Sequence, residues 1–193
     1  MPEAALPVVV IDDGGLPALV SALMVNEPAA THIWCISSNP RGVHVSQYRT
    51  GRLAFASFTR GVAESPLPEM LLASLRFAVE INAHSVVWPF FSSVDVERMS
   101  LAACRVRLVE ELIALETPAN SALPRLETPL LDLDPPRICD LAVDMGAPID
   151  ARNVWWCETQ GPRVCGRCDE CRRWQSALAA PRCWERDSAV AGA

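Results

Sequence analysis

Four cysteines near the C-terminal end constrain this chain more than any other feature. Cys165, Cys168 and Cys171 form a CxxCxxC run, and Cys157 lies eight positions upstream. Two-residue spacings let neighbouring sulfur atoms reach one metal ion without backbone strain, and four thiolates suit the tetrahedral coordination of structural zinc. The run therefore predicts a four-cysteine zinc site that closes this segment into a loop.

Two other uses of the cysteines stay open. The bacterial ferredoxin pattern opens with the same run, but it continues with a fourth cysteine followed by proline, and position 175 here is Gln. Structural disulfides are the second alternative, although closely spaced CxxC pairs more often bind metal or carry out redox chemistry. Zinc is the favoured interpretation.

Length and composition indicate one domain. The 193 residues suffice for one sizeable hydrophobic core, and half of them are apolar with few aromatics, which is typical of an α/β protein. No stretch approaches the ~20 uncharged apolar residues of a transmembrane helix, and the first residues lack the basic start of a secretory signal. We therefore expect a cytoplasmic protein with no membrane partner and with reduced cysteines.

The charged residues exclude several kinds of chemistry. The formal net charge is −6, and all 17 basic residues are arginine. A negative balance disfavours affinity for phosphate backbones, so a nucleic-acid partner is not expected, although arginines cluster locally between 163 and 173. Without lysine the chain can form neither a Schiff base nor the lysine contact of a phosphate-binding loop.

Short apolar segments alternate with longer amphipathic ones along the chain. The run 8–11 leads into a glycine turn at 12–15 and a helix at 16–24 with Pro17 in its first turn. Further extended segments are expected at 31–36, 52–58, 85–88 and 126–132, and further helices at 66–83, 94–116, 134–146 and 171–180. In the helix at 94–116, the residues expected to face the core are Leu101, Leu108, Leu112 and Leu115. This alternation predicts a doubly wound α/β fold with a mainly parallel sheet.

Several stretches resemble the 7-cyano-7-deazaguanine synthases (QueC), a branch of the PP-loop ATP pyrophosphatase superfamily. The similarity is carried by the segment 126–133 (LETPLLDL), by the helix end at 145–148 (MGAP), by the pair Trp155 and Trp156, and by the four cysteines at the family's own spacing. A weaker echo is Ala103-Cys104-Arg105. The resemblance is close over residues 125–178 and loose over most of the remaining chain.

The resemblance implies a fold and an activity. The fold is adenine nucleotide alpha hydrolase-like, and the activity is an ATP-dependent ligation that converts 7-carboxy-7-deazaguanine and ammonia to the nitrile in queuosine biosynthesis. The resemblance also implies a structural zinc ion, a substrate-binding role for Arg105, and an SGGxDS loop for ATP and Mg after the first strand. By this likeness, residues 1–150 form the PP-loop-like body, 151–185 form a zinc-binding extension packed on it as one globular unit, and 186–193 form a tail.

The loop expected to bind ATP is degenerate here. It reads Asp13-Gly14-Gly15-Leu16-Pro17-Ala18, so a carboxylate replaces the first hydroxyl, Pro replaces the acid and Ala replaces the last hydroxyl. Two like charges ~4 Å apart cost several kcal/mol at protein-like dielectric. In addition, Pro17 has no N–H and Ala18 has no hydroxyl to donate to a phosphate. We expect binding of ATP and Mg to be impaired.

Two functions follow from these observations. The first is an altered ligase of the deazaguanine pathway, with an intact zinc loop and an unusual ATP site. The second is a catalytically inactive, zinc-stabilised pseudoenzyme that binds a deazapurine, a partner protein or an RNA. A homodimer, or a companion enzyme that supplies the phosphate chemistry, fits either function.

Overall fold

The computed structural model describes residues 5–25, 27–61, 66–118, 121–159, 161 and 163–179. Its parallel strands form one sheet in the order β3-β2-β1-β4-β5. The strands are β1 (Val8–Asp12), β2 (Thr31–Cys35), β3 (Ser57–Arg60), β4 (Ser85–Val87) and β5 (Arg125–Glu127). Every residue of β1 and β4 is buried, as expected for central parallel strands that are continuous apolar runs in sequence.

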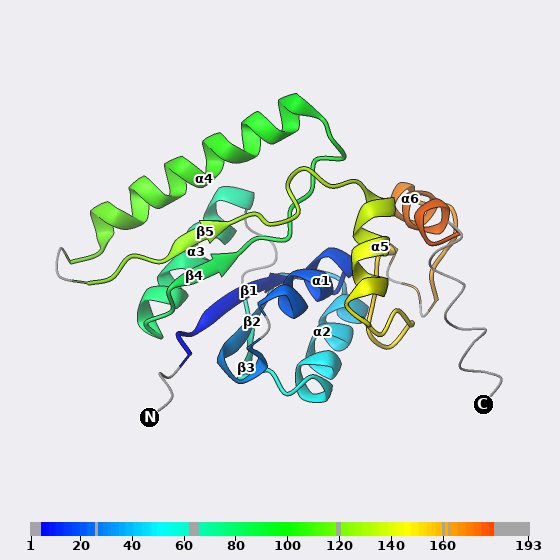
Figure 1. Cartoon of the computed structure of the whole chain (residues 1–193), viewed down its shortest axis with the longest axis horizontal. Helices are drawn as coiled ribbons and strands as arrows, with labels where there is room; N and C mark the ends of the chain where they lie inside the picture. The colour runs from blue at the N-terminus through cyan, green and yellow to red at the C-terminus, as the bar shows by residue number, and fades with distance from the viewer. Residues whose placement is uncertain are drawn as a thin grey trace.

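Helices cover both faces of this sheet (Figure 1). They are α1 (Leu16–Met24), the short 3-10 helix η1 (Pro28–Ala30), α2 (Pro40–Arg52), α3 (Leu67–Glu80), α4 (Val96–Glu116), α5 (Pro135–Asp144) and α6 (Asp169–Leu178). Helices α3 and α4 pack around Val9 and Ile11 of β1, and α1 packs on the other face around Val8 and Val10. The predicted doubly wound α/β fold with a parallel sheet is confirmed.

A second core joins α1, α5 and α6. Leu16 and Leu19 of α1 are buried in one cluster with Ile138 of α5 and Trp174 of α6. Figure 1 shows α5 and α6 side by side next to α1, away from α4. The helices that follow β5 are therefore anchored on the first strand-turn-helix unit.

The strand predicted at 52–58 is wrong in position, because residues up to Arg52 form α2 and β3 begins at Ser57.

Pro40 and Gly42 look like helix breakers in the sequence. Pro40, however, occupies the first turn of α2, where a missing N–H costs nothing. A Cβ on Gly42 would lie 2.7 Å from the carbonyl oxygen of Asp13, so close packing of α2 against the loop after β1 requires a glycine there.

The buried face of α4 also differs from the prediction. Ala102, Val109 and Ile113 are buried, whereas the residues predicted to face the core are exposed, namely Leu101, Leu108, Leu112 and Leu115. Each buried residue follows one of the leucines by one position, which corresponds to a rotation of the helix by about 100°. Small and β-branched side chains let α4 approach the sheet closely, and this contact decides which face is buried.

The other predicted elements lie within a few residues of the observed ones. The tail from residue 186 falls outside the described residues, and the domain bounds at 150 and 185 stay a prediction. None of the described helices combines the length and the apolar character needed to cross a membrane.

Candidate ligand crevice and metal centre

The strand order creates a crevice at the carboxyl ends of β1 and β4. The chain leaves β1 toward β2 on one side and later continues in β4 on the other side, and open parallel sheets bind ligands where the strand order reverses in this way. Residues 13–16, which we call the glycine loop, follow β1 directly and end in Leu16, the buried first residue of α1. Trp88 follows β4. Of the predicted nucleotide-binding residues, Asp13 and Gly15 line the hollows at this place, whereas Gly14 and Leu16 do not.

The N–H groups of the glycine loop are already bonded within the chain. The N–H of Gly14 donates to Oδ1 of Asp12 at 2.6 Å, and that of Gly15 donates to Oδ1 of Asp13 at 2.8 Å. The turn is tight, because Gly14 has a φ of +91° and a Cβ there would lie 2.7 Å from Cα of Gly42. The loop keeps the shape of an anion-binding turn, but its own carboxylates occupy these two donors.

A buried arginine neutralises the carboxylate beneath the glycine loop. Arg49 of α2 donates from Nε to Oδ2 of Asp12 at 3.0 Å and from Nη2 to Oδ1. Its Nη1 donates to the carbonyl oxygens of Gly15 and Asn153, both at 3.1 Å. Ser46 adds a hydrogen bond of 2.6 Å to Asp12. Both charged side chains are buried, so the positive charge of Arg49 is used inside the protein and does not point into the crevice.

Asp13 brings negative character to the crevice. Asp13 is exposed and lines the crevice. Desolvation by the surrounding protein raises the pKa of Asp13 above its ordinary value of 3.8, and the nearby charge of Asp12 raises it further. The N–H of Gly15 and the charge of Arg49 act in the opposite direction but do not cancel the rise. A second anion next to Asp13 is therefore unfavourable.

The structure brings the four predicted cysteines together at the other wall of the crevice. The Sγ atoms of Cys157, Cys165, Cys168 and Cys171 all lie within 4.8 Å of one another, and those of Cys165 and Cys171 are 3.9 Å apart. In a tetrahedral centre with Zn–S bonds of ~2.3 Å, the sulfur atoms are about 3.8 Å apart. A disulfide needs ~2.05 Å. The group can hold one metal ion.

The surroundings of the sulfur atoms favour the thiolate at some of these cysteines and oppose it at another. The backbone N–H of Cys165 donates to Sγ of Cys157, and that of Cys168 donates to Sγ of Cys165, both at 3.3 Å. Two backbone N–H groups lower the pKa of Cys165 to about 6. Burial raises the pKa of Cys171 to about 12, so its thiol needs a bound cation to lose its proton at neutral pH. This donor set fits a thiophilic divalent ion such as zinc, which deprotonates the thiols it binds.

Trp155 and Asn39 fasten the cysteine segment to the glycine loop. The N–H of Trp155 donates to the carbonyl oxygen of Gly14 at 2.8 Å, and its Nε1 donates to that of Cys157 at 2.9 Å. Nδ2 of Asn39 donates to the carbonyl oxygens of Cys157 and Thr159 at 3.2 and 3.0 Å. One backbone hydrogen bond and three from side chains therefore tie the cysteine segment to the crevice.

Two adjoining hollows open above the glycine loop and share Asp13, Phe91 and Glu170. The first has a volume of about 220 Å³ and is lined by Asp13, Gly15, Pro17, Ser37, Asn39, Phe91, Trp155, Trp156, Cys157, Glu158, Glu170 and Trp174. The second has a volume of about 250 Å³ and reaches Trp88 and Arg98. Together they form what we call the crevice.

The first hollow is aromatic and acidic. Four aromatic rings and the carboxylates of Asp13, Glu158 and Glu170 line it, and its lining contains no arginine or histidine. Glu170 accepts from Arg173 and from Nε1 of Trp174 at 2.5 and 3.1 Å. Nε1 of Trp156 is buried and has no hydrogen-bond partner among the described residues. Such a hollow suits a flat ring that donates N–H groups, and it opposes a polyphosphate.

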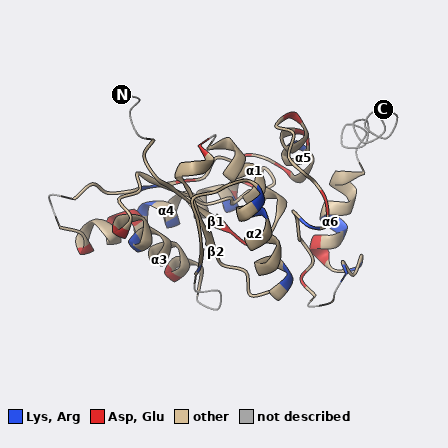
Figure 2. Cartoon of the chain, turned by 90° about the horizontal axis from the view of Figure 1, so that it is seen from below, with Lys and Arg blue, Asp and Glu red and all other residues tan. Residues whose placement is uncertain are grey.

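The arginines predicted to form a basic patch are partly neutralised. On α6, Arg172 pairs with Asp169 and Arg173 pairs with Glu170. Figure 2 shows both signs of charge along α6. The two arginines of α6 are therefore paired with carboxylates of their own helix, although Arg173 also lines the second hollow together with Arg98.

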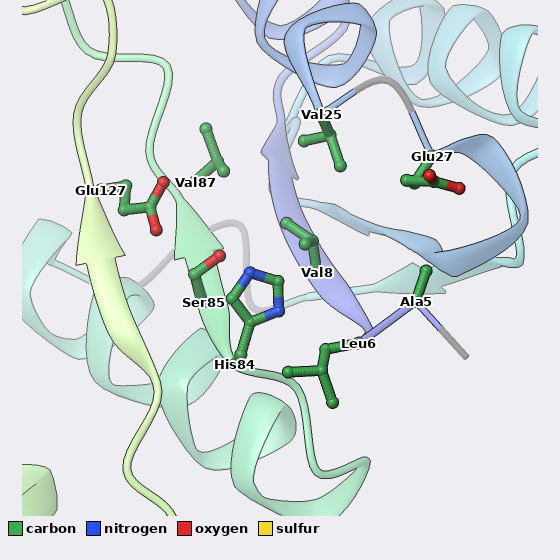
Figure 3. Close-up of a pocket in the computed structure, with 9 residues that line it drawn as sticks. All are labelled: Ala5, Leu6, Val8, Val25, Glu27, His84, Ser85, Val87 and Glu127. Carbon is green, nitrogen blue, oxygen red and sulfur yellow. The ribbon is translucent and has the colours of Figure 1, made fainter. Parts of the chain in front are cut away.

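A third hollow of about 240 Å³ lies at the opposite edge of the sheet from the crevice, near the amino ends of β1 and β4 (Figure 3). Val8, Val25 and Val87 contribute aliphatic walls, and His84 lies beside them with Nδ1 donating to the carbonyl oxygen of Pro7 at 3.0 Å. Neither the glycine loop nor the cysteines line this hollow. Because parallel sheets bind ligands at the carboxyl ends of their strands, the crevice is the candidate site.

Arg105 lies half-buried on α4 and is not among the residues that line the crevice, so its substrate-binding role stays a prediction. Arg98, seven residues earlier on the same helix, does line the crevice and lies over the ring of Phe90 at 5.5 Å. Sequence reasoning also missed Glu170 and Arg49. They come from helices far from the glycine loop in sequence, and no local pattern signals their approach.

Comparison with known proteins gives partial matches. The chain matches no family model. A segment of 102 residues is 29% identical to the 7-cyano-7-deazaguanine synthase of Acidobacterium capsulatum, covering 52% of this chain and 42% of that protein. A segment of 48 residues is 44% identical to the proteins of the same name from the Prochlorococcus marinus strains MIT 9312 and AS9601.

The chain is similar to the 7-cyano-7-deazaguanine synthases. The 48-residue matches cover 25% of this chain and 20% of each Prochlorococcus synthase. The matches span less than half the length of these curated synthases, so the likeness concerns a part of each protein.

Proposed function

We propose that the protein is a synthase-like scaffold that binds a flat, deazaguanine-like base in the crevice and does not bind nucleotide phosphates at the glycine loop. The observation that carries this proposal is the internal use of the loop donors: Gly14 and Gly15 give their N–H groups to Asp12 and Asp13. A phosphate at this loop would have to displace a carboxylate and would then lie beside it. Both steps are unfavourable.

The choice of a base follows from the crevice lining and from the relatives' name. A deazaguanine has a flat face and an edge with adjacent N–H donors and a carbonyl acceptor. Trp155 and Trp156 offer indole surface, and Glu158 offers a carboxylate that can accept from such an edge. The aromatic and acidic groups thus match the ring, whereas they repel a triphosphate.

In this proposal the four cysteines hold zinc, and the role of zinc is structural. All four ligand positions are occupied by thiolates, so the ion has no open position for substrate or water. Zinc would fix the cysteine segment, and through Trp155 it would fix the edge of the crevice at Gly14.

Calorimetric titration tests the proposal with 7-cyano-7-deazaguanine and, separately, with ATP and Mg. We expect the base to bind and ATP to show no binding up to millimolar concentration. Replacing Glu158 with Gln removes the carboxylate charge and should weaken base binding by about tenfold or more, as for a hydrogen bond to a charged group. Glu97→Gln is the matched control, because Glu97 is an exposed carboxylate that does not line the crevice.

The second candidate is an altered ligase, which the name of the relatives favours. Incubation with 7-carboxy-7-deazaguanine, ammonia, ATP and Mg separates the two functions. Formation of the nitrile with consumption of ATP would overturn the proposal of a phosphate-free site. Absence of both, together with binding of the base, would support it.

A further inference from the structure

The third hollow, at the amino ends of β1 and β4, has an apolar floor and a buried hydroxyl. Val8 and Val87 belong to the floor and are 6 and 3% exposed. Ser85, which is 2% exposed, lines the hollow beside them, and its hydroxyl has no hydrogen-bond partner among the described residues. Figure 3 shows Ser85 between Glu127 and His84. Because buried hydroxyls normally have a partner, this one is available to a ligand in the hollow.

Two carboxylates lie at the rim of the third hollow. Glu127 ends β5 and Glu27 precedes η1, and both are exposed and line the hollow. The ion pairs among the described residues all use other carboxylates, so no described arginine neutralises either charge. Figure 3 shows the two side chains on opposite sides of Val8, Val25 and Val87. They do not form a metal-binding group, since the four cysteines are the group of that kind found among the described residues.

The end of α1 adds negative character to the same place. Val25, the C-cap residue of α1, lines the hollow, and the last turn of the helix carries no basic residue. The carbonyl end of a helix favours a cation. In addition, Nδ1 of His84 donates to the carbonyl oxygen of Pro7, which leaves Nε2 of the neutral ring as an acceptor. Arg125 lies on the same strand as Glu127 but does not line the hollow, so the polar groups of the hollow together favour a cation.

We propose that the third hollow binds an aliphatic diamine, with one ammonium group at Glu127 and Ser85 and the other at Glu27. The alkyl chain between them lies over Val8 and Val87, where its burial is favourable. Each ammonium group has three N–H donors and no acceptor, which matches carboxylates and a hydroxyl. A ligand with one ammonium group, such as a lysine side chain, would leave one carboxylate unpaired. The third hollow shares no lining residue with the crevice, so this site is independent of the base proposed there.

Calorimetric titration of the full chain with 1,4-diaminobutane at low salt tests the proposal. We expect the diamine to bind, and n-butylamine to bind about fivefold more weakly because it lacks one ion pair. Glu127→Gln and Glu27→Gln should each weaken diamine binding by about fivefold for the same reason. Ser85→Ala should weaken it by about 2- to 12-fold, as for one neutral hydrogen bond. Circular dichroism of each variant shows whether the fold is kept.

A third carboxylate provides the matched control. Glu69 is likewise exposed and outside the ion pairs of the described residues, but it lies at the start of α3 and does not line the hollow. Glu69→Gln should leave diamine affinity unchanged. Equal weakening by this change would overturn the proposal, because it would indicate general attraction to a protein with a net charge of −6. So would absence of binding up to about 10 mM diamine, or equal affinity for the diamine and for n-butylamine.

Discussion

Replacing Arg49 with Met tests whether the buried charge pair supports the glycine loop. The change keeps an unbranched apolar stem but removes the guanidinium. Asp12 then keeps only the N–H of Gly14 and the hydroxyl of Ser46, while the carbonyl oxygens of Gly15 and Asn153 lose their donor. The variant therefore leaves a charge and two polar groups buried without their partner.

The expected cost follows from this loss. Removing one partner of a buried ion pair costs about 3–5 kcal/mol, out of the 5–15 kcal/mol typical of a domain. With a urea dependence of about 2 kcal/mol per molar, the unfolding midpoint should fall by about 1.5–2.5 M. Tryptophan fluorescence in urea, at saturating zinc, measures this midpoint.

A second arginine provides the control. Arg76 makes an equally close pair with Glu116, with N–O distances of 2.8 and 2.7 Å, but this pair is solvent-exposed. Arg76→Met should lower the urea midpoint far less than Arg49→Met, because water screens the pair. The combined variant Asp12→Asn and Arg49→Met should be more stable than the two single losses added together. The reasoning would be refuted if Arg49→Met lowered the urea midpoint by less than about 0.5 M. It would also be refuted if the effects of Arg49→Met and Asp12→Asn were fully additive.

Three further outcomes follow. The variant Cys168→Ser should lose the bound metal, as measured by elemental analysis, and should no longer unfold cooperatively in a melting curve. If the unaltered protein is brown when it is purified without oxygen, the cysteines hold iron and sulfur in place of zinc. Because the pKa of Asp13 is raised in the folded state, Asp13→Asn should stabilise the protein at pH 7. This gain in stability should shrink as the pH falls through the raised pKa and should vanish below the ordinary value of 3.8. A gain that grows on acidification would contradict the assignment. Gly14→Ala should lower the urea midpoint strongly, because of its φ of +91° and its contact with Gly42, whereas Gly51→Ala, which meets nothing within 4 Å, should raise stability by up to about 1 kcal/mol.

The features predicted from sequence are those set by local pattern. The buried run of β1, the glycine turn and Pro17 in the first turn of α1 are found as predicted, since each depends on residues that are neighbours in the chain. The grouping of the cysteines is found as well, because short spacings restrict where the sulfur atoms can go.

The features missed from sequence depend on distant contacts. Gly42 is required by the approach of the loop after β1, which the local pattern of α2 does not contain. On α4, leucine spacing suggested one buried face, but the fit of Ala102 and Val109 against the sheet selected another. Arg49 was missed because a buried arginine is recognised by its partner Asp12, which lies in a different element.

The hydrogen bond from Trp155 to Gly14 has a consequence for how the protein would respond to its surroundings. Only Trp156 separates this contact from Cys157, one of the four cysteines that can hold a metal ion, and Nε1 of Trp155 donates to the carbonyl oxygen of that cysteine. A chelator that never enters the crevice would then act as an inhibitor of ligand binding, and a ligand seated against the indoles would slow the escape of the ion. Metal occupancy at the cysteines and ligand affinity in the crevice would therefore rise and fall together.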